Sequence, residues 1–235
     1  MQNNFKKILL FLVLVISSLI FYFTNKINKS RKIEKINISI KSDSNYFISK
    51  DSVKSILMDK VFIKKDSIST YSLEKLIDKN NYIEKSEVYK GIGNELNFII
   101  NQKQPIARII TDDSTFYLDN NSNFMTLSRL YSKNVPLIFG YNQYSDLIFL
   151  TKIFHIINDD KFLKKNVTKV FISDDNEISL KLRELKPIIE IGKNNRLNEK
   201  MKKLKALYIR SDVKNDINKY SSLNLRFKQQ IIGVK

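Results

Sequence analysis

The sequence has no cysteine, no tryptophan, a single histidine, and only 5 glycines and 3 prolines among its 235 residues. Without cysteine, the chain forms no disulfide framework, thiol nucleophile or thiolate metal site. One histidine, His155, excludes a zinc centre built from several histidines. The adjacent acids Asp159-Asp160 and Asp174-Asp175 are typical of turns and helix ends rather than of a calcium or magnesium site. We therefore expect no metal and no cofactor.

Catalytic motifs are missing as well. Ser-x-x-Lys occurs at 72–75 and 211–214, but neither Ser-Asp-Asn nor Lys-Thr-Gly accompanies it, as a serine transpeptidase would require. The glycines at 91 and 93 lack the further glycine or Lys-Ser/Thr of a phosphate-binding loop. The sequence therefore predicts that the protein is not an enzyme. A membrane-anchored envelope hydrolase or transpeptidase is the catalytic alternative.

Basic residues are abundant, since 41 Lys and Arg against 24 Asp and Glu give a net charge of +17. They are scattered along the chain rather than gathered in one block, which is typical of a solvated surface. A basic module that binds an anionic lipid or nucleic acid is the non-catalytic alternative. Residues 26–35 suit lipid headgroups, and the basic helix predicted at 198–210 suits nucleic acid. The apolar stripe of that helix indicates core packing instead, so we expect no nucleic acid and no small-molecule substrate.

An apolar run from Ile8 to Phe23, interrupted only by two serines, begins after a short N-terminal segment. About 17–25 such residues span a bilayer. We predict a transmembrane helix over residues 8–24, preceded by a tail of residues 1–7. No small-x-small cleavage site follows the run, which favours a retained anchor over a cleaved signal peptide. The side chains expected to anchor it in lipid are Ile8, Leu12, Val15, Leu19 and Phe23.

The charges around this run give a contrary indication of its orientation. Residues 26–35 contain more Lys and Arg than the tail ahead of the run. Taken literally, the positive-inside rule places the C-terminal part of the chain in the cytoplasm.

The segment 33–103 reads as strand, helix, helix, strand, strand. Isoleucines alternate with polar residues over 33–40, and apolar residues recur at helical spacing over 70–79. Two strand-like runs follow, at 83–90 and 95–103. Three strands with two helices on one face make a complete two-layer module. Beyond Pro105 most runs are strand-like, with helices at 144–157 and 197–208, so the fold class is α+β.

The last predicted strand runs from Leu223 to Ile232. Its apolar side chains share one face; they are Leu223, Leu225, Phe227 and Ile231. Of these, Leu223, Leu225 and Phe227 are expected to lie in the core. Arg226, Lys228 and Gln230 lie on the other face. A terminal strand at a sheet edge presents unpaired N–H and C=O groups, which another chain can extend.

Five ordered segments resemble the FtsQ/DivIB family, in the form found in Bacteroidota-type bacteria. They are NQKQPIARI at 101–109, FYLDNNSNFMTLS at 116–128, VPLIFG at 135–140, NEKMKKLKALY at 198–208 and YSSLNLRFKQQII at 220–232. Each is weak alone, but their order and spacing cover nearly the whole chain. The sequence departs from the family in its very short tail and in Phe227, where the family often has tyrosine.

The resemblance implies a cell-division protein of the bacterial inner membrane, with its C-terminal part periplasmic at the septum. The implied domains are the tail 1–7, the transmembrane helix 8–24, a POTRA domain at 33–104 and a β domain at 105–235. Such proteins bind FtsB- and FtsL-like partners and help to regulate septal peptidoglycan synthesis by FtsW and FtsI. The partner adds a strand to the last β-strand.

The implied partner-binding residues therefore surround that last strand. They are Tyr220, Leu223, Asn224, Leu225, Arg226, Phe227, Lys228 and Gln229. For Arg226, an ion pair with the partner and one within the domain are equally compatible with the sequence.

Overall fold

The structure of the protein, a computed structural model, describes residues 2–30, 33, 35–41, 46–61, 69–92, 95–193, 195–209 and 214–235. The chain divides into two compact units, Met1–Gln102 and Lys103–Lys235. Among the features named above, Gly93, Arg31, Lys32 and residues 210–213 lie outside the described residues.

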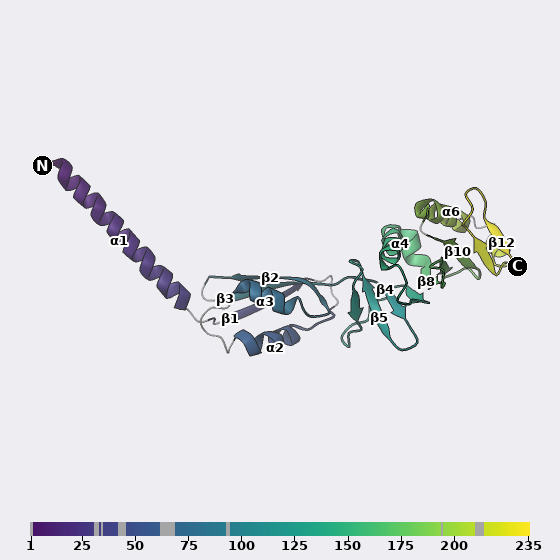
Figure 1. The fold of residues 1–235 in the computed structure, drawn as a ribbon, viewed down its shortest axis with the longest axis horizontal. Coiled ribbons are helices and arrows are strands. Elements are labelled where there is room, and N and C mark those ends of the chain that lie inside the picture. Colours follow the sequence, from purple (N-terminus) through teal and green to yellow (C-terminus); the bar gives the residue numbers. More distant parts are fainter. Residues whose placement is uncertain are drawn as a thin grey trace. The chain divides into compact units, whose positions relative to one another are not determined.

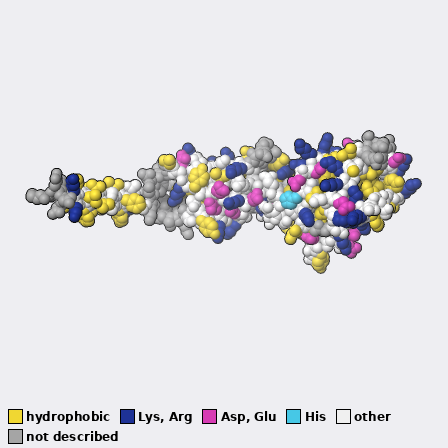
Figure 2. Space-filling model, turned by 90° about the horizontal axis from the view of Figure 1, so that it is seen from above, with side chains coloured by type: hydrophobic (Ala, Val, Ile, Leu, Met, Phe, Trp, Pro, Cys, Tyr) yellow, Lys and Arg dark blue, Asp and Glu magenta, His cyan; other side chains and the backbone are white. Residues whose placement is uncertain are grey.

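The first element, α1 (Gln2–Ser30), is a helix of 29 residues. Its stretch from Lys6 to Lys26 has a mean hydropathy of 2.3 and buries nothing within the protein. At 1.5 Å per residue this stretch is about as long as the 30 Å hydrocarbon core of a bilayer is thick. Figure 2 shows its apolar side chains in yellow. An apolar N-terminal helix is thus present, compatible with a single-pass anchor, and all five predicted anchor side chains are exposed on it.

The rest of the first unit is a three-stranded sheet with two helices, in the element order expected from the sequence. The elements are β1 (Lys35–Lys41), α2 (Lys50–Val61), α3 (Thr70–Ile77), β2 (Ile83–Lys90) and β3 (Glu95–Gln102). The strand order is β1-β3-β2, with β1 parallel and β2 antiparallel to β3 (Figure 1). Alternate strand residues such as Ile38, Val88 and Phe98 pack with Val53 and Leu73 of the helices.

Helix α3 also covers the outer edge of β2. The carboxylate of Asp78 accepts hydrogen bonds from the backbone N–H and the hydroxyl of Ser86, both at 2.7 Å. The carboxylate of Glu74 accepts one from the N–H of Val88 at 2.8 Å. Charged acceptors thereby satisfy backbone groups that an edge strand would otherwise present to another chain.

The second unit is built on one mixed nine-stranded sheet. Its strand order is β12-β11-β10-β9-β8-β7-β4-β5-β6. The strands are β4 (Pro105–Ile110), β5 (Thr115–Asp119), β6 (Phe124–Thr126), β7 (Leu137–Phe139), β8 (Val167–Ile172), β9 (Ile178–Leu182), β10 (Ile188–Gly192), β11 (Ser222–Asn224) and β12 (Ile232–Val234). The pairs β4/β7, β7/β8 and β10/β11 are parallel, and the others are antiparallel.

The described helices of this unit contribute to one core on one face of the sheet (Figure 1). They are α4 (Leu147–Asp159), α5 (Lys161–Asn166), α6 (Leu197–Ile209) and α7 (Lys214–Ile217). Buried side chains of the helices, such as Phe154 and Leu204, meet Val170 and Ile189 of the strands. The alternate strand residues point to the other face, which no described helix covers.

Acidic residues begin two of these helices. Asp146 caps α4 through the N–H of Phe149, which starts the helix later than the predicted residue 144. Asp160 caps α5, a helix that the sequence analysis missed, through the N–H groups of Phe162 and Leu163. The hydrogen bond from Lys205, at 2.7 Å, and these backbone donors hold the pKa of Asp160 below its usual range.

The prediction of one long final strand is wrong. Residues 222–224 form β11, residues 225–231 form an irregular connection, and residues 232–234 return as β12. Leu223 and Leu225 are buried as expected. The alternation stops at Phe227 because side chains elsewhere in the unit hold the backbone of the connection, as described below.

Candidate partner-binding site at the C-terminal sheet edge

The strand β11 has no free edge, because β10 pairs with one side of it and β12 with the other. Leu223 and Asn224 therefore cannot receive an added strand directly, which corrects the expectation placed on them. The end of the sheet is β12, whose only strand partner among the described residues is β11.

The register identifies the outward backbone groups of β12. The N–H of Leu225 donates to the backbone carbonyl of Glu190, and the N–H of Ile188 donates to the backbone carbonyl of Ser221. The carbonyl of Ser221 and the N–H of Leu225 thus face β10, whereas the N–H of Ser221 already donates to Val234 of β12; by alternation Ser222 and Asn224 face β12. Their partners there are residues 234 and 232. By the alternation of an extended strand, the N–H and C=O of Gly233 point away from the sheet.

Tyr220 fixes the position of β12 through Gly233. A Cβ atom on Gly233 would lie 2.5 Å from Cδ1 of Tyr220, far inside van der Waals contact. Glycine is required here because it lets the tyrosine ring lie directly against the strand backbone. Tyr220, one of the predicted site residues, thus supports the edge from within the protein.

Arg226 forms ion pairs inside the domain. Its guanidinium nitrogens lie 3.0 Å from Glu177 Oε2 and 3.1 Å from Glu190 Oε2. The side chain lies over Gly192, whose φ of +73° and close contact with Arg226 both favour glycine. Of the two alternatives for Arg226, the structure contains the ion pair within the domain.

Two further cations hold the backbone of the connection 225–231. Lys203 Nζ, from α6, donates to the carbonyl of Phe227 at 2.5 Å. Arg196 donates to the carbonyl of Arg226 at 2.9 Å. These hydrogen bonds turn residues 226–228 away from a strand conformation, which explains why Phe227 is not in the core.

Lys200, also from α6, holds the end of β10 and the backbone that follows it. Its ammonium group is buried and donates to the carbonyl of Ile191 at 2.7 Å and to Asn195 Oδ1 at 2.6 Å. Burial lowers the pKa of Lys200, and the nearby Arg196, Lys203 and Arg226 lower it further. Lys200 lies in the basic helix predicted at 198–210, and scattered cations of this kind were expected on a solvated surface. This expectation is wrong for Lys200, because its three ammonium donors find acceptors inside the domain, the third being the carbonyl of Lys193 at 3.3 Å.

Three apolar side chains are exposed at this end of the sheet. Phe227 is 46% exposed, Ile232 39% and Val234 49%. The expectation of a buried Phe227 is therefore wrong. Lys228 and Gln229 are also exposed. An exposed aromatic ring and two β-branched side chains beside an open strand edge can contact an added strand.

The predicted last strand ends at Ile232, so the separate edge strand Ile232–Val234 was not predicted. Glu177, Glu190 and Lys203 were not predicted as supporting residues either. The Ile-Gly-Val ending was the available signal for β12, because its two β-branched residues alternate around a glycine. Nothing in the sequence pairs Glu177 and Glu190 with Arg226, because that contact depends on the order of the strands.

Among the described residues, no group of three or more His, Asp or Glu side chains could hold a metal ion. His155 lies exposed on α4, with Nε2 3.2 Å from the carbonyl oxygen of Asn120. The candidate site consists of the outward backbone groups of β12 and the exposed apolar side chains beside them.

An N-terminal apolar helix and a large mixed sheet define an α+β protein, and its candidate site is a sheet edge. The family model described as FtsQ/DivIB, C-terminal related, matches residues 104–234, which is more than half of the 235 residues. The chain belongs to this family, as the sequence resemblance indicated. No curated protein matches it significantly. The family is generally non-catalytic, and it indicates a role in cell division with other division proteins as partners.

Proposed function

We propose that the protein is a non-catalytic scaffold of the division complex. It is anchored in the inner membrane by α1, with residues 33–104 as a POTRA domain and residues 105–235 as a β domain in the periplasm at the septum. It binds FtsB- and FtsL-like membrane proteins and thereby helps to regulate septal peptidoglycan synthesis by the FtsW and FtsI complex. Family membership and the N-terminal apolar helix support this proposal.

Binding occurs by strand addition at β12, and this open edge is the observation that carries the proposal. A partner strand pairs with the outward N–H and C=O of Gly233 and adjoins Ile232 and Val234. Phe227 supplies an aromatic contact beside that strand. Leu223 and Leu225 belong to the core beneath the edge, and Tyr220 and Arg226 hold the edge in place.

The test places charge on the edge without altering the core. Ile232→Lys with Val234→Lys introduces lysines at two exposed positions, as natural edge strands do to prevent pairing. A control, Leu130→Lys with Ile148→Lys, changes two more exposed apolar residues elsewhere in the same unit. Each full-length variant is recovered from membranes with its bound proteins.

We expect the amount of division-protein partners recovered with the edge variant to fall by about tenfold or more. A loss of about 1.4 kcal/mol of binding free energy is enough to weaken the affinity tenfold. The control should retain them. Equal recovery of partners by both variants would refute strand addition at β12. A catalytic role would instead be supported if the purified wild-type chain hydrolysed peptidoglycan.

A further inference from the structure

A hollow lies near the middle of the large sheet, at the start of β7 and β8, away from the terminal strand β12. It has a volume of about 430 Å³. Six basic side chains line it, and no Asp or Glu is among the lining residues that the structure describes; the six are Arg108, Lys133, Lys164, Lys165, Lys169 and Arg183. They come from β4, the segment before β7, α5, β8 and the end of β9. We call this site the basic hollow.

Most of these charges have no internal counter-ion. Lys164, Lys165 and Arg183 form no ion pair with any acidic residue that the structure describes, and Lys169 lies 5.5 Å from the ring centroid of Phe139. This contrasts with Arg226, which two carboxylates neutralise. Like charges gathered around a concave surface create a positive potential that attracts anions.

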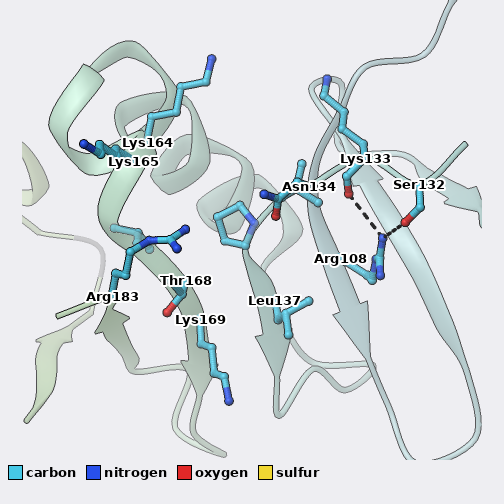
Figure 3. A pocket seen from close by; sticks show the side chains of 13 residues that line it. Arg108, Ser132, Lys133, Asn134, Leu137, Lys164, Lys165, Thr168, Lys169 and Arg183 are labelled. Atoms are coloured by element: carbon cyan, nitrogen blue, oxygen red, sulfur yellow. Dashed lines mark hydrogen bonds between the residues drawn. The ribbon is translucent and has the colours of Figure 1, made fainter. Parts of the chain in front are cut away.

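Arg108 is fixed in place by neutral groups only. Its guanidinium donates to Ser132 Oγ at 2.7 Å and to the carbonyl of Lys133 at 3.3 Å (Figure 3). It also donates to Tyr117 Oη at 2.6 Å. Its Nε is buried and has no hydrogen-bond partner among the described residues. The hydrogen bonds hold the cation at the wall of the hollow without cancelling its charge.

The arrangement of the cations indicates the shape of the ligand. Figure 3 shows the lysines extending in different directions around the hollow rather than towards one point. Sites for a single phosphate bring several donors together on one anion. Separate cations around an apolar floor of Val135, Pro136 and Leu137 match separate charges along an extended chain instead. A flat membrane surface does not enter such a concavity.

On one side, the basic hollow continues along the sheet towards another hollow. Lys169 joins the basic hollow to Phe139, which is stacked on Phe171 with ring centroids 5.6 Å apart. Phe171 in turn lines another hollow, of about 510 Å³, beside Arg226. All of these side chains lie on the sheet face that no described helix covers.

We propose that the basic hollow binds an extended acidic segment of a partner protein, rich in Asp and Glu. Its carboxylates pair with the lysines of the rim, and its backbone lies over Pro136 and Leu137. This surface is separate from β12 and does not depend on strand addition, so the protein contacts its partners at two places. Charge pairs at such a rim mainly set the association rate and its salt dependence.

The test uses the full chain in neutral detergent and a fluorescein-labelled deca-glutamate peptide, with binding followed by anisotropy. The site variant is K164E/K165E/K169E. The matched control is K152E/K193E/K202E, which reverses three exposed lysines of the same unit that do not line the basic hollow. Both variants have the same net charge, so they separate a local site from the general basicity of the chain.

We expect the site variant to bind the peptide at least about tenfold more weakly than the control and the wild type. Binding should weaken as salt rises from about 50 mM to about 200 mM. The edge variant I232K/V234K should bind the peptide as the wild type does, so failure at β12 and failure at the basic hollow are distinguishable.

Three outcomes would overturn the proposal. Equal weakening in the site and control variants would mean that only net charge matters. Displacement of the peptide by equimolar inorganic pyrophosphate would identify a phosphate site. Tighter binding of a single-stranded oligonucleotide through the same lysines would identify a nucleic-acid site. A thermal melt of each variant checks that the second unit remains folded.

Discussion

The outer backbone groups of the edge strands β2 and β12 differ in whether side chains of the protein hydrogen-bond to them. At β2, the carboxylates of Asp78 and Glu74 accept the N–H groups of Ser86 and Val88. At β12, no described side chain from another element reaches the outer backbone groups, and the nearest exposed side chains are apolar. The first edge lies beside a helix that carries acids at the right spacing. The second ends the chain's own sheet without such a cover.

This difference shows how a chain can make one sheet edge less available for strand pairing than another. Unpaired edges associate indiscriminately unless they are covered, charged or twisted. Covering β2 with carboxylates removes one competing edge, so β12 remains available for a specific partner. The cations that hold residues 225–231 keep this second edge rigid although it is open.

The largest expected effect comes from uncovering β2. Asp78→Ala removes the acceptor for both the N–H and the hydroxyl of Ser86, which is only 2% exposed. The buried N–H is then left unsatisfied and the hydroxyl keeps only the carbonyl of Glu74 at 3.3 Å, which should lower the free energy of unfolding by about 2–3 kcal/mol. Urea unfolding of the full chain in neutral detergent, with hydrogen exchange at residues 83–90, measures the change.

A matched control is Asp51→Ala, because the Asp51 side chain is 93% exposed and pairs with Lys54 only at 3.9 Å. Its removal should change stability by less than about 0.5 kcal/mol. If both variants unfold alike, the carboxylate of Asp78 does not protect the β2 edge.

A smaller effect is expected from displacing β12. Gly233→Val places side-chain atoms within the ring of Tyr220, and overpacking of this kind costs about 1–3 kcal/mol. Hydrogen exchange at Ser222 and Asn224 should become faster, because these residues pair with β12.

The double variant Tyr220→Ala with Gly233→Val removes the clash and serves as the control. It should regain part of the protection that the single variant loses. If Gly233→Val alone leaves exchange unchanged, the contact between Tyr220 and Gly233 does not determine where the edge lies.

The smallest effect is a pH dependence of the C-terminal edge. Burial holds the folded-state pKa of Lys200 below 10.5, so the unfolded chain binds more protons between the two values. The free energy of unfolding should therefore rise with pH through that window, as the cost of burying the charged lysine is relieved.

Lys200→Met should abolish this rise, and it should lower stability by about 1 kcal/mol near neutral pH because the carbonyl of Ile191 loses its donor. Lys202→Met, on the exposed side of α6, is the control and should keep the pH dependence. Equal pH profiles for the wild type and the Lys200 variant would contradict the assignment.

Much of the fold could be predicted from local patterns. The alternation at residues 95–103 corresponds to β3, and the apolar stripe at 197–208 corresponds to α6. Both patterns reflect which side chains face a core, and this depends mainly on the spacing of apolar residues. The connection at 225–231 was misassigned because Phe227 continues the alternation in sequence, whereas Lys203 and Arg196 redirect its backbone.

The candidate sites were predicted less completely. The predicted last strand covers part of the C-terminal end of the sheet, but the strand that forms this end is centred on Gly233 and not on Leu223. The basic hollow was not identified, since its cations lie as far apart in sequence as Arg108 and Arg183. Their lysines and arginines look like any other part of a scattered basic surface.

The sequence by itself determined the apolar N-terminal helix, the order of elements in the first unit, and the lack of thiol and His-rich chemistry, because these follow from composition and from spacing along the chain. Only the tertiary structure decided that β11 lies inside the sheet, that β12 forms its end, and that six cations surround one hollow. Strand neighbours are chosen by pairing between distant segments, and no local pattern records that choice.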